Sequence, residues 1–442
     1  MFAGSAGQDQ MSTSGRGSLT NQELQEKYAI DTSVDFSAAD LTGFNVAHPS
    51  LFVEDKHWAV FDRLREEQPL HYCADSQFGP YWSVTRYEDI KYVDSHHEIF
   101  SSDSKLGGAF LGEHAGSKDR RVPENFINMD PPEHSAHRKS VAPYFAGANL
   151  KVLEVEIRTR ATSILDGLPV GEEFNWVSEV SVEITSQILA TLFQIPQEDR
   201  HKLIYWTDVA SQLDSPELFV DRAAGRAVLD EMGAYFAEYW RSAAQSEPKM
   251  NLISLLAHDP ATADLDTQHM LAMMILLVIA GNDTTRNSMT GGVLALNRFP
   301  DEYTRLLQNP THIPSMVPEI IRYQTPVAHM ARTATQEVAM HGQTIKEGDR
   351  VAMWYISGNR DQREISDPYS FQIDRAQPRK HLSFGFGIHR CLGNRLAEMQ
   401  LRIVWEEITK RFGRIEMIEP PTYIPSSFIH GISELTVVIP KS

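Results

Sequence analysis

The chain has 442 residues, enough to bury a large core, and its 41 Lys and Arg against 59 Asp and Glu give a net charge of −18. This balance argues against nucleic acid as a partner, because binding phosphates requires a basic face. The two cysteines exclude a disulfide framework and are typical of a reducing compartment, so we predict a cytoplasmic protein.

The N-terminal segment differs in composition from the rest of the chain. Residues 1–20 are rich in Gly, Ser and Gln and lack the apolar core of a signal peptide or membrane anchor. We predict a disordered lead-in over residues 1–35 and one large domain over residues 36–442. The longest apolar run, Met270 to Ala280, is shorter than the roughly 18 residues of a spanning helix, which predicts a soluble protein without a membrane span.

Helical periodicity dominates the chain after this lead-in. A helix is predicted over residues 58–67, and the alternation from His71 to Thr85, with Phe78-Gly79-Pro80 at its turn, predicts a small hairpin. Residues 100–125 are Gly-rich and polar, which predicts a long surface loop. Further helices are predicted over residues 129–144, 180–193, 218–241, 266–298, 301–307 and 314–323.

The helix over residues 266–298 is the longest of these. It is apolar nearly all round in its middle, so we expect it to be buried at the centre of the fold. Short strands are predicted after residue 330, at 338–340 and 350–354, and a hairpin is predicted over 432–439. The fold class is therefore mainly α with a minor β part, in a single large domain.

The most informative stretch is Phe384-Gly385-Phe386-Gly387-Ile388-His389-Arg390-Cys391-Leu392-Gly393, which precedes a helix predicted over residues 394–412. The positive end of that helix and the charge of Arg390 both favour the thiolate form of Cys391. A lone cysteine cannot complete a tetrahedral zinc site, whereas a single thiolate can be the axial ligand of a haem iron. The alternative is a buried free cysteine at a junction between loop and helix.

This decapeptide resembles the haem-binding signature of the cytochromes P450. The resemblance implies the cytochrome P450 fold, with residues 36–442 as the haem-thiolate catalytic domain. It also implies a haem b whose iron is bound by Cys391 and whose faces lie against Phe384, Gly385, Ala280 and Gly281.

A second motif, Ala280-Gly281-Asn282-Asp283-Thr284-Thr285, places small and polar residues inside the long apolar helix. Such residues lower the stability of a buried helix unless something compensates, and they could open or kink it locally. The hexapeptide resembles the oxygen-activation motif of the same family, which implies that Asp283 and Thr284 form a catalytic pair that passes protons inward. A polar bend with satisfied hydrogen bonds is the alternative.

Two further sets of charged residues match family positions. Glu319 and Arg322, three residues apart, match the Glu-x-x-Arg motif, and with Arg375 they imply a structural network that holds the cysteine loop. The resemblance also implies cations that bind the haem propionates, at His134, Arg138, Arg332 and His389.

Four stretches resemble the bacterial alkane and fatty-acid terminal hydroxylases within this family: residues 78–86, 280–289, 321–326 and 393–402. This likeness implies ω-hydroxylation of linear aliphatic chains of medium length. Residues at the matching positions are candidates for the substrate pocket, although each could equally belong to the core: Leu276, Leu277, Ile279, Val327, Ala328, Met330, Phe428 and Ile429.

The reaction implied by the resemblance uses O₂ and two electrons, and no part of the chain resembles a flavin or iron–sulfur domain. We therefore expect a separate [2Fe-2S] ferredoxin with an NAD(P)H-dependent reductase. A local basic patch could receive it, unless these residues are ordinary exposed charges: Arg138, Lys139, Arg379, Lys380, Arg390, Arg395 and Arg402.

Two alternative functions remain open at this point. A steroid side-chain terminal hydroxylase has a similar central-helix motif, but with glutamate where Asp283 stands. A haem-thiolate protein that only binds ligands belongs to another class, and Asp283 and Thr284 argue against it because a binder needs no proton relay.

Overall fold

The computed structural model describes residues 29–31, 33, 36–112, 124–213 and 222–441. The predicted lead-in over residues 1–35 therefore lies almost wholly outside the described residues. Among the described residues the helices are α2 His57–Glu67, α3 Tyr87–Ser95, α4 Glu133–Val141, α5 Gly147–Asp166, α6 Glu183–Phe193, α7 Arg200–Leu213, α8 Arg222–Ala244, α9 Leu252–His258, α10 Thr267–Arg298, α11 Pro300–Gln308, α12 Ile313–Gln324, α13 Tyr355–Gly358 and α14 Asn394–Arg411.

Short strands form four small sheets in the described part of the chain. The strands are β1 Leu70–Cys73, β2 Tyr81–Val84, β3 Phe100–Ser101, β4 Glu173–Asn175, β5 Met330–Ala334, β6 Val338–Met340, β7 Gln343–Ile345, β8 Arg350–Met353, β9 Glu416–Met417, β10 Thr422–Tyr423, β11 Ile432–Glu434 and β12 Thr436–Val438. The predicted class, mainly α with a minor β part, is confirmed.

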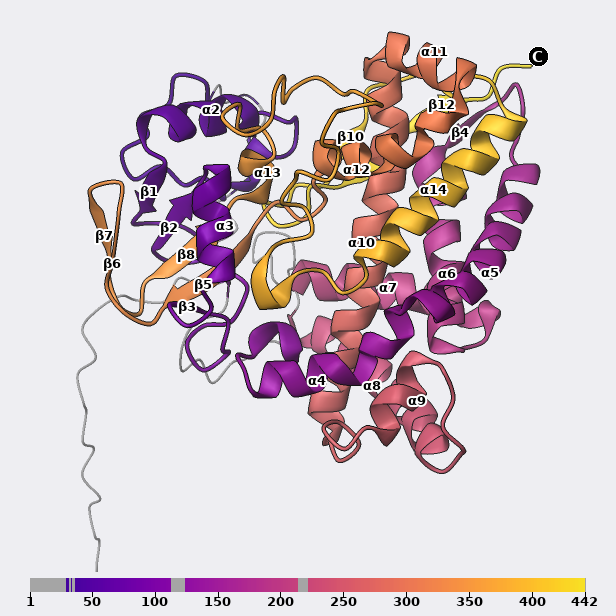
Figure 1. Cartoon of the computed structure of the whole chain (residues 1–442), viewed down its shortest axis with the longest axis horizontal. Coiled ribbons are helices and arrows are strands. Elements are labelled where there is room, and N and C mark those ends of the chain that lie inside the picture. Colours follow the sequence, from indigo (N-terminus) through magenta and orange to yellow (C-terminus); the bar gives the residue numbers. More distant parts are fainter. Residues whose placement is uncertain (1–28, 32, 34–35, 113–123, 214–221, 442) are drawn as a thin grey trace, which may run out of the picture.

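The long helix α10 runs through the middle of the molecule, as the sequence predicted (Figure 1). Its side chains from Asn287 to Leu296 are all buried, and it packs against α6, α7, α8, α12 and α14. The carboxylate of Asp266 accepts a hydrogen bond from the His269 N–H at 2.9 Å and caps the first turn. At 1.5 Å per residue the helix is about 48 Å long, enough to link both sides of the fold.

The five-stranded sheet joins three strands from the N-terminal part of the chain, β1, β2 and β3, with two from its C-terminal part, β5 and β8. Its order is β1-β2-β8-β5-β3, with β2 and β8 parallel and the other pairs antiparallel. Figure 1 shows this sheet, with α2 and α3 beside it, to the left of the helical part. The predicted hairpin of β1 and β2 is confirmed, with Leu70 opposite Val84. The sheet thereby places Met330 and Arg332 on β5 toward the helical part.

The predicted C-terminal hairpin is wrong. Strands β11 and β12 do not pair with each other, because β11 pairs with β10 and β12 with β4 and β9. Only Leu435 separates the two strands, which is too short for a hairpin turn. The Leu435 carbonyl instead accepts a hydrogen bond from the Trp176 N–H at 2.9 Å, so the chain passes from one sheet to another.

The predicted surface loop over residues 100–125 is also wrong for its described part. Residues 113–123 lie outside the described residues, but Phe100, Ala109 and Leu111 are buried. Arg350 donates to the carbonyl of Gly108 at 2.9 Å and to that of Phe110 at 2.5 Å, which fixes this segment against the sheet. Hydrogen bonds between a distant side chain and backbone carbonyls cannot be predicted from the composition of a segment.

The remaining predicted helices are present with shifted ends. The helix predicted over 129–144 begins at Glu133 and ends at Val141, followed by a 3₁₀ turn over Ala142–Phe145. The helix predicted over 218–241 corresponds to α8, which begins at Arg222, and residues 214–221 lie outside the described residues. None of the helices that the structure describes is long and apolar enough to cross a membrane.

Candidate active site

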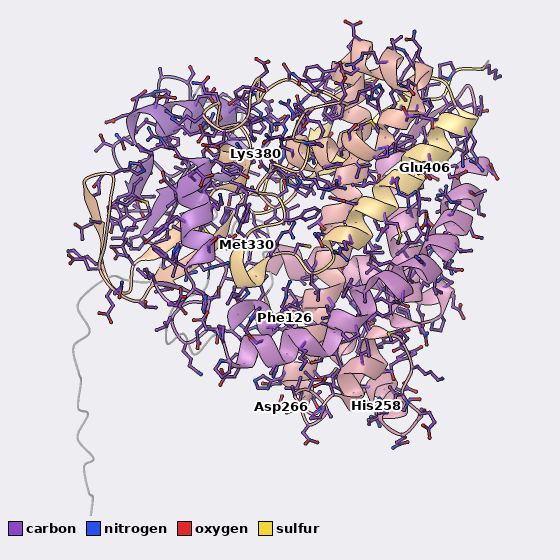
Figure 2. All side chains as sticks on the ribbon, in the orientation of Figure 1. Phe126, His258, Asp266, Met330, Lys380 and Glu406 are labelled. Atoms are coloured by element: carbon purple, nitrogen blue, oxygen red, sulfur yellow. The ribbon has the colours of Figure 1, made fainter. Side chains whose placement is uncertain are left out.

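A cavity of about 300 Å³ lies between α10, the cysteine loop, β5 and the C-terminal loop before β11. Figure 2 labels two of its lining residues, Phe126 from the segment before α4 and Met330 from β5. The lining is predominantly apolar and includes Cys391, Thr284 and a few other polar side chains. Such a cavity suits an apolar ligand held at one end by specific groups.

The cysteine loop owes its path to two glycines. Gly385 and Gly387 have φ angles of 63° and 62°, in the left-handed region that glycine adopts without strain. A Cβ on Gly387 would lie 2.3 Å from the Asp94 carbonyl oxygen, so no larger residue fits there. The Asp94 carboxylate accepts hydrogen bonds from the Phe386 N–H at 2.7 Å and from the Tyr355 hydroxyl at 2.9 Å.

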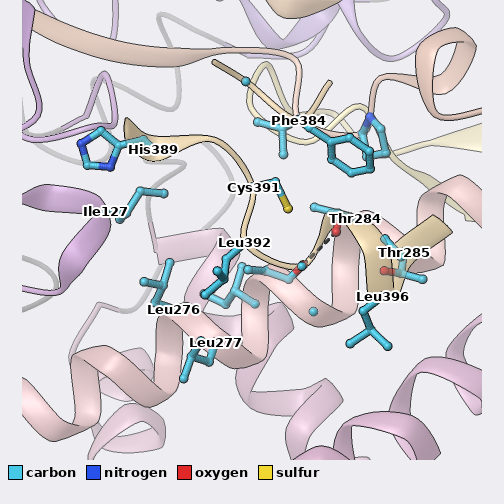
Figure 3. Close-up of a pocket in the computed structure, with 18 of the residues that line it drawn as sticks. Ile127, Leu276, Leu277, Thr284, Thr285, Phe384, His389, Cys391, Leu392 and Leu396 are labelled. Carbon is cyan, nitrogen blue, oxygen red and sulfur yellow. Dashed lines mark hydrogen bonds between the residues drawn. The ribbon is translucent and has the colours of Figure 1, made fainter. Parts of the chain in front are cut away.

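The thiol of Cys391 opens into this cavity. Figure 3 shows the side chain projecting from its loop toward the part of α10 that carries Thr284. Burial raises the pKa of Cys391, and the N–H groups of Gly393 and Asn394 and the charges of Arg138 and Arg390 oppose that rise only in part. The helix start and Arg390 thus favour the thiolate, as the sequence predicted, but burial has the larger effect in the protein alone. A bound metal cation would reverse the balance.

Buried donors lie beside the cysteine loop. Within the described part of the chain, both ring nitrogens of His134 and the Nε2 atom of His389 are buried without a hydrogen-bond partner. The two rings lie edge to face with centroids 4.4 Å apart. Burial and the nearby Arg138 guanidinium lower the pKa of His134 to about 4. These unpartnered groups are suited to receive anionic oxygens.

Two arginines complete this cationic side of the cavity. Arg332 lines the cavity from β5, and its guanidinium donates to the Asp94 carboxylate at 2.7 Å. Arg138 lines it from α4 and donates to the carbonyl of Arg390. Of the four residues predicted to meet the haem propionates, Arg138, Arg332 and His389 line the cavity, whereas His134 lies behind them against the His389 ring. Burial lowers the pKa of both histidines, so the two arginines supply the positive charge. Two propionate carboxylates would accept hydrogen bonds from the arginines and from the one N–H group of each neutral ring.

On α10 the two predicted catalytic residues face in different directions. Thr284 lines the cavity, and its hydroxyl donates to the Ala280 carbonyl at 2.8 Å (Figure 3). Asp283 is buried, is not among the cavity residues, and forms an ion pair with Arg286 at 2.9 Å. Arg286 also lies 3.4 Å from Asp208 of α7, whose side chain is 44% exposed. The polar chain therefore runs from behind Thr284 toward the surface.

Helix α10 continues without a break from Thr267 to Arg298, so the helix is not interrupted at Gly281. Gly281 instead permits close packing, because a Cβ there would lie 2.9 Å from the Leu189 side chain of α6. Ala280 and Gly281 both line the cavity. Small residues at this point widen the cavity without interrupting the helix.

The network of Glu319, Arg322 and Arg375 forms behind the site. Both Glu319 and Arg322 are fully buried, with their side chains joined by two hydrogen bonds of 2.7 Å. Arg375 donates to the same carboxylate at 2.9 Å, and Arg322 also donates to the Asn359 and Pro368 carbonyls. Burial would raise the pKa of Glu319, but the two guanidinium groups hold it below its usual range. The arrangement fixes the segment that leads into the cysteine loop.

Seven of the eight predicted pocket residues line the cavity: Leu276, Leu277, Ile279, Val327, Met330, Phe428 and Ile429. Ala328 does not. It is fully buried, its N–H donates to the Phe428 carbonyl at 2.8 Å, and it packs in the core beside Trp354. Alternation along an extended segment explains this, because neighbours of a lining residue point the other way.

Sequence reasoning missed several residues that shape the site. Asp94 organises the cysteine loop and Arg332, although it lies on α3, far away in the chain. Phe110, Ile188, Leu189 and Leu192 line the cavity from elements without a recognisable motif. The only sequence signal for Asp94 was an acidic residue within a predicted helical pattern, and such residues are common on exposed helix faces.

Comparison with known proteins places this site in a family. Residues 157–428 match the family model described as cytochrome P450. The chain belongs to the cytochrome P450 family. The match is supported by linalool 8-monooxygenase from Pseudomonas putida, 32% identical over 406 residues that cover 90% of this chain and 99% of the relative. A methyl-branched lipid omega-hydroxylase from Mycobacterium tuberculosis (strain ATCC 25618 / H37Rv) is 31% identical over 404 residues, covering 87% and 91%.

Solved structures agree with this cytochrome P450 assignment. CYP153D17 from Sphingomonas sp. PAMC 26605 is 40% identical, with a TM-score of 0.84 and coverage of 90% of this chain and 98% of that one. The protein is accordingly a cytochrome P450 monooxygenase with a haem-thiolate cofactor, which depends on O₂ and redox partners. Family membership sets aside the alternative of a protein that only binds ligands.

Proposed function

We propose that this cytochrome P450 hydroxylates the terminal carbon of linear aliphatic chains of medium length, such as alkanes and fatty acids, with residues 36–442 as its catalytic domain. The observation that carries the proposal is the apolar cavity into which Cys391 and Thr284 both open. The name of the mycobacterial omega-hydroxylase among its relatives supports the same reaction.

The cavity residues fit a haem b. Cys391 would bind its iron, and His134, Arg138, Arg332 and His389 would bind its propionates. Phe384, Gly385, Ala280 and Gly281, which all line the cavity, would lie against its faces. When bound, a thiolate-ligated haem would supply O₂ activation: with two electrons and two protons, one oxygen atom enters a C–H bond and the other leaves as water.

Residues of α10 would transfer protons between solvent and the cavity. The Thr284 hydroxyl donates to the Ala280 carbonyl, so its oxygen can accept a hydrogen bond from a water molecule and hold that water in the cavity as a proton donor. Asp283 and Arg286 stand behind it, and the partly exposed Asp208 connects them with solvent. Burial raises the pKa of Asp208, which brings its carboxyl closer to the range where it can exchange protons.

Selectivity for the chain end must be geometric, because a terminal methyl has stronger C–H bonds than the methylenes beside it. Leu276, Leu277 and Ile279 from α10 and Phe428 from the opposite loop would confine the chain so that only its end approaches Cys391. Burial of each methylene contributes about 0.8 kcal/mol, so affinity should rise with chain length until the cavity is full.

Electrons would come from a [2Fe-2S] ferredoxin with an NAD(P)H-dependent reductase. Of the predicted basic residues, Lys139, Arg390 and Arg395 are exposed near the cysteine loop. Arg379, Lys380 and Arg402 form ion pairs with Glu398, Glu364 and Glu154, which weakens their attraction for an acidic partner. The docking patch we propose is therefore smaller than the sequence alone predicted.

The test is product regiochemistry. The purified haem-loaded protein, with a surrogate ferredoxin and reductase, is given a medium-chain alkane, the matching fatty acid and, separately, a sterol. Predominantly terminal alcohol from the linear substrates supports the proposal. Mainly subterminal alcohols would overturn the confined-chain argument, and hydroxylation of the sterol side chain alone would favour the steroid alternative.

A further inference from the structure

A second cluster of metal-ligating side chains lies away from the haem cavity. Asp55, from the turn before α2, meets His57 of α2 and His430 of the loop before β11. One ligand atom from each residue lies within 4.8 Å of the other two. The side chains of His57 and His430 are buried, and that of Asp55 is 14% exposed. The cluster therefore joins two segments more than 370 residues apart in sequence.

Both histidines turn their Nδ1 atoms toward backbone carbonyls. His57 Nδ1 lies 3.3 Å from the Leu51 oxygen, and His430 Nδ1 lies 2.6 Å from the Gln324 oxygen. This contact places a proton on Nδ1 of both rings. In His57 it leaves a lone pair on Nε2, the arrangement seen around histidines that bind metals. In His430 the Nε2 atom also donates, to the Asp55 carboxylate, and a bound cation would displace that proton. The backbone carbonyls thus orient both rings, and His57 already presents a free lone pair.

The two Nε2 atoms differ in what they contact. His430 Nε2 lies 2.8 Å from the Asp55 carboxylate, whereas His57 Nε2 is fully buried and finds no partner among the described residues. A buried neutral nitrogen with a vacant lone pair is an unmet acceptor, and a cation would satisfy it.

The surroundings leave room for a further ligand. A small cavity of about 40 Å³ beside the cluster is lined by Asp55 and His430 but not by His57, and Arg298 and Arg360 also line it. Its volume is enough for one water molecule. Arg298 lies 3.5 Å from the Asp55 carboxylate, and its positive charge weakens the attraction for a dication while favouring an anionic or hydroxide-like fourth ligand.

We propose that Asp55, His57 and His430 form a structural site for a late first-row divalent cation, represented by Zn²⁺. Two imidazole nitrogens and one carboxylate with a water match the preferences of zinc, and the histidines disfavour Mg²⁺ and Ca²⁺. Tetrahedral binding would draw the ligand atoms to roughly 3.3 Å apart, given Zn–N and Zn–O bonds of about 2 Å.

The position of the site gives it a structural consequence. His430 directly follows Phe428 and Ile429, which line the haem cavity. A cation bound by Asp55, His57 and His430 would tie this wall of the cavity to the turn before α2, adding a metal crosslink between distant parts of the chain.

The test measures zinc binding by the haem-loaded full chain without an affinity tag, after removal of metals with a chelator. Isothermal titration and elemental analysis after gel filtration give the stoichiometry. We expect one equivalent of Zn²⁺ per chain above the background of other histidines, at least tenfold weaker binding in Asp55→Asn, and unchanged binding in the control His201→Asn, whose side chain is 59% exposed.

Two variants keep the experiment decisive. Asp55→Asn preserves the shape of the side chain, and His57→Phe preserves its stacking on Phe52 while removing both nitrogens. A normal thiolate-type carbon monoxide spectrum verifies that each variant is folded, and Zn²⁺ should raise the melting temperature of the parent protein but not of the variants. Equal zinc binding by the parent and both variants, or none by the parent, would reduce the cluster to a hydrogen-bonded pair of Asp55 and His430.

Discussion

At the scale of single residues, Thr284 combines a polar group with a position on the cavity wall. The lining residues Leu276, Leu277 and Ile279 on the same helix are apolar. Thr284, Thr285 and Ser288 are the polar residues that α10 contributes to the cavity. The bond from Thr284 to the Ala280 carbonyl fixes the rotamer but leaves the oxygen's lone pairs available. The Thr284 side chain is therefore placed to bind a water molecule that can donate a proton in the cavity.

We predict that Thr284→Ala lowers the amount of alcohol formed per NAD(P)H consumed by at least tenfold, with the difference released as hydrogen peroxide. The reason is that the methyl group cannot hold a proton donor at this point of the cavity. Product and NAD(P)H are measured in the same reaction.

Thr284→Ser is the matched control, because it keeps the hydroxyl and should retain most of the coupling. Full coupling in Thr284→Ala would show that water or another side chain supplies the proton. Equal loss in both variants would point to packing of the threonine methyl group instead.

Single residues also mark the limit of sequence-based prediction. Cys391, Thr284 and the Glu319 network could be recognised because each belongs to a short motif with fixed spacing. Asp94 could not, because its partners Phe386 and Arg332 are 292 and 238 residues away. The net effect on the Cys391 thiol was also hidden, since burial depends on the whole fold and outweighs the local charges.

At the scale of elements, the cysteine loop depends on its contact with α3. Gly387 and Gly348 both have positive φ angles, 62° and 85°, yet a Cβ on Gly348 would meet nothing within 4 Å whereas one on Gly387 would meet the Asp94 carbonyl at 2.3 Å. Comparing alanine substitutions at these two glycines therefore separates the free-energy cost of left-handed backbone from the cost of a steric clash.

We predict that Gly348→Ala lowers the free energy of unfolding by roughly 1–2 kcal/mol, the cost of left-handed backbone for alanine, and leaves the haem spectrum unchanged. Gly387→Ala should lose more stability and also lower the fraction of protein with a thiolate-type carbon monoxide spectrum, because the loop must move away from α3. Urea unfolding and the spectrum are measured on both. Identical behaviour of the two variants would mean that the contact with Asp94 does not hold the loop.

Elements were predicted best where periodicity runs for many residues. Helix α10 agrees within one residue of its expected limits because 33 residues of consistent pattern outweigh local exceptions such as Gly281. The strands β11 and β12 were expected to pair with each other, since they are consecutive, but their partners β10, β4 and β9 lie elsewhere in the chain. Pairing between short strands is decided by tertiary contacts rather than by propensity.

At the scale of the whole molecule, burial of neutral histidines links stability to pH. Burial lowers the pKa of His329 to about 4 and that of His381 to about 3. His329 packs on Trp354 with ring centroids 4.5 Å apart and contacts the Ser427 carbonyl at 2.9 Å, so its ring cannot take up a proton without disturbing this part of the core. In the unfolded chain a histidine titrates near pH 6.5.

Between about pH 6.5 and pH 4 the unfolded state therefore binds more protons than the folded state, so the free energy of unfolding must fall as the pH falls through this window. We predict that His329→Gln, which keeps a donor for the Ser427 carbonyl, reduces this slope by up to about 1.4 kcal/mol per pH unit, the value for one proton.

Urea unfolding of the haem-loaded parent and variant at several values from pH 7 to pH 5 gives the slopes, and their difference cancels contributions from haem release. His201→Asn, at an exposed position, controls for the loss of a histidine as such. A slope in His329→Gln as steep as in the parent would place the acid sensitivity elsewhere, with His57 and His381 as the next buried rings to replace.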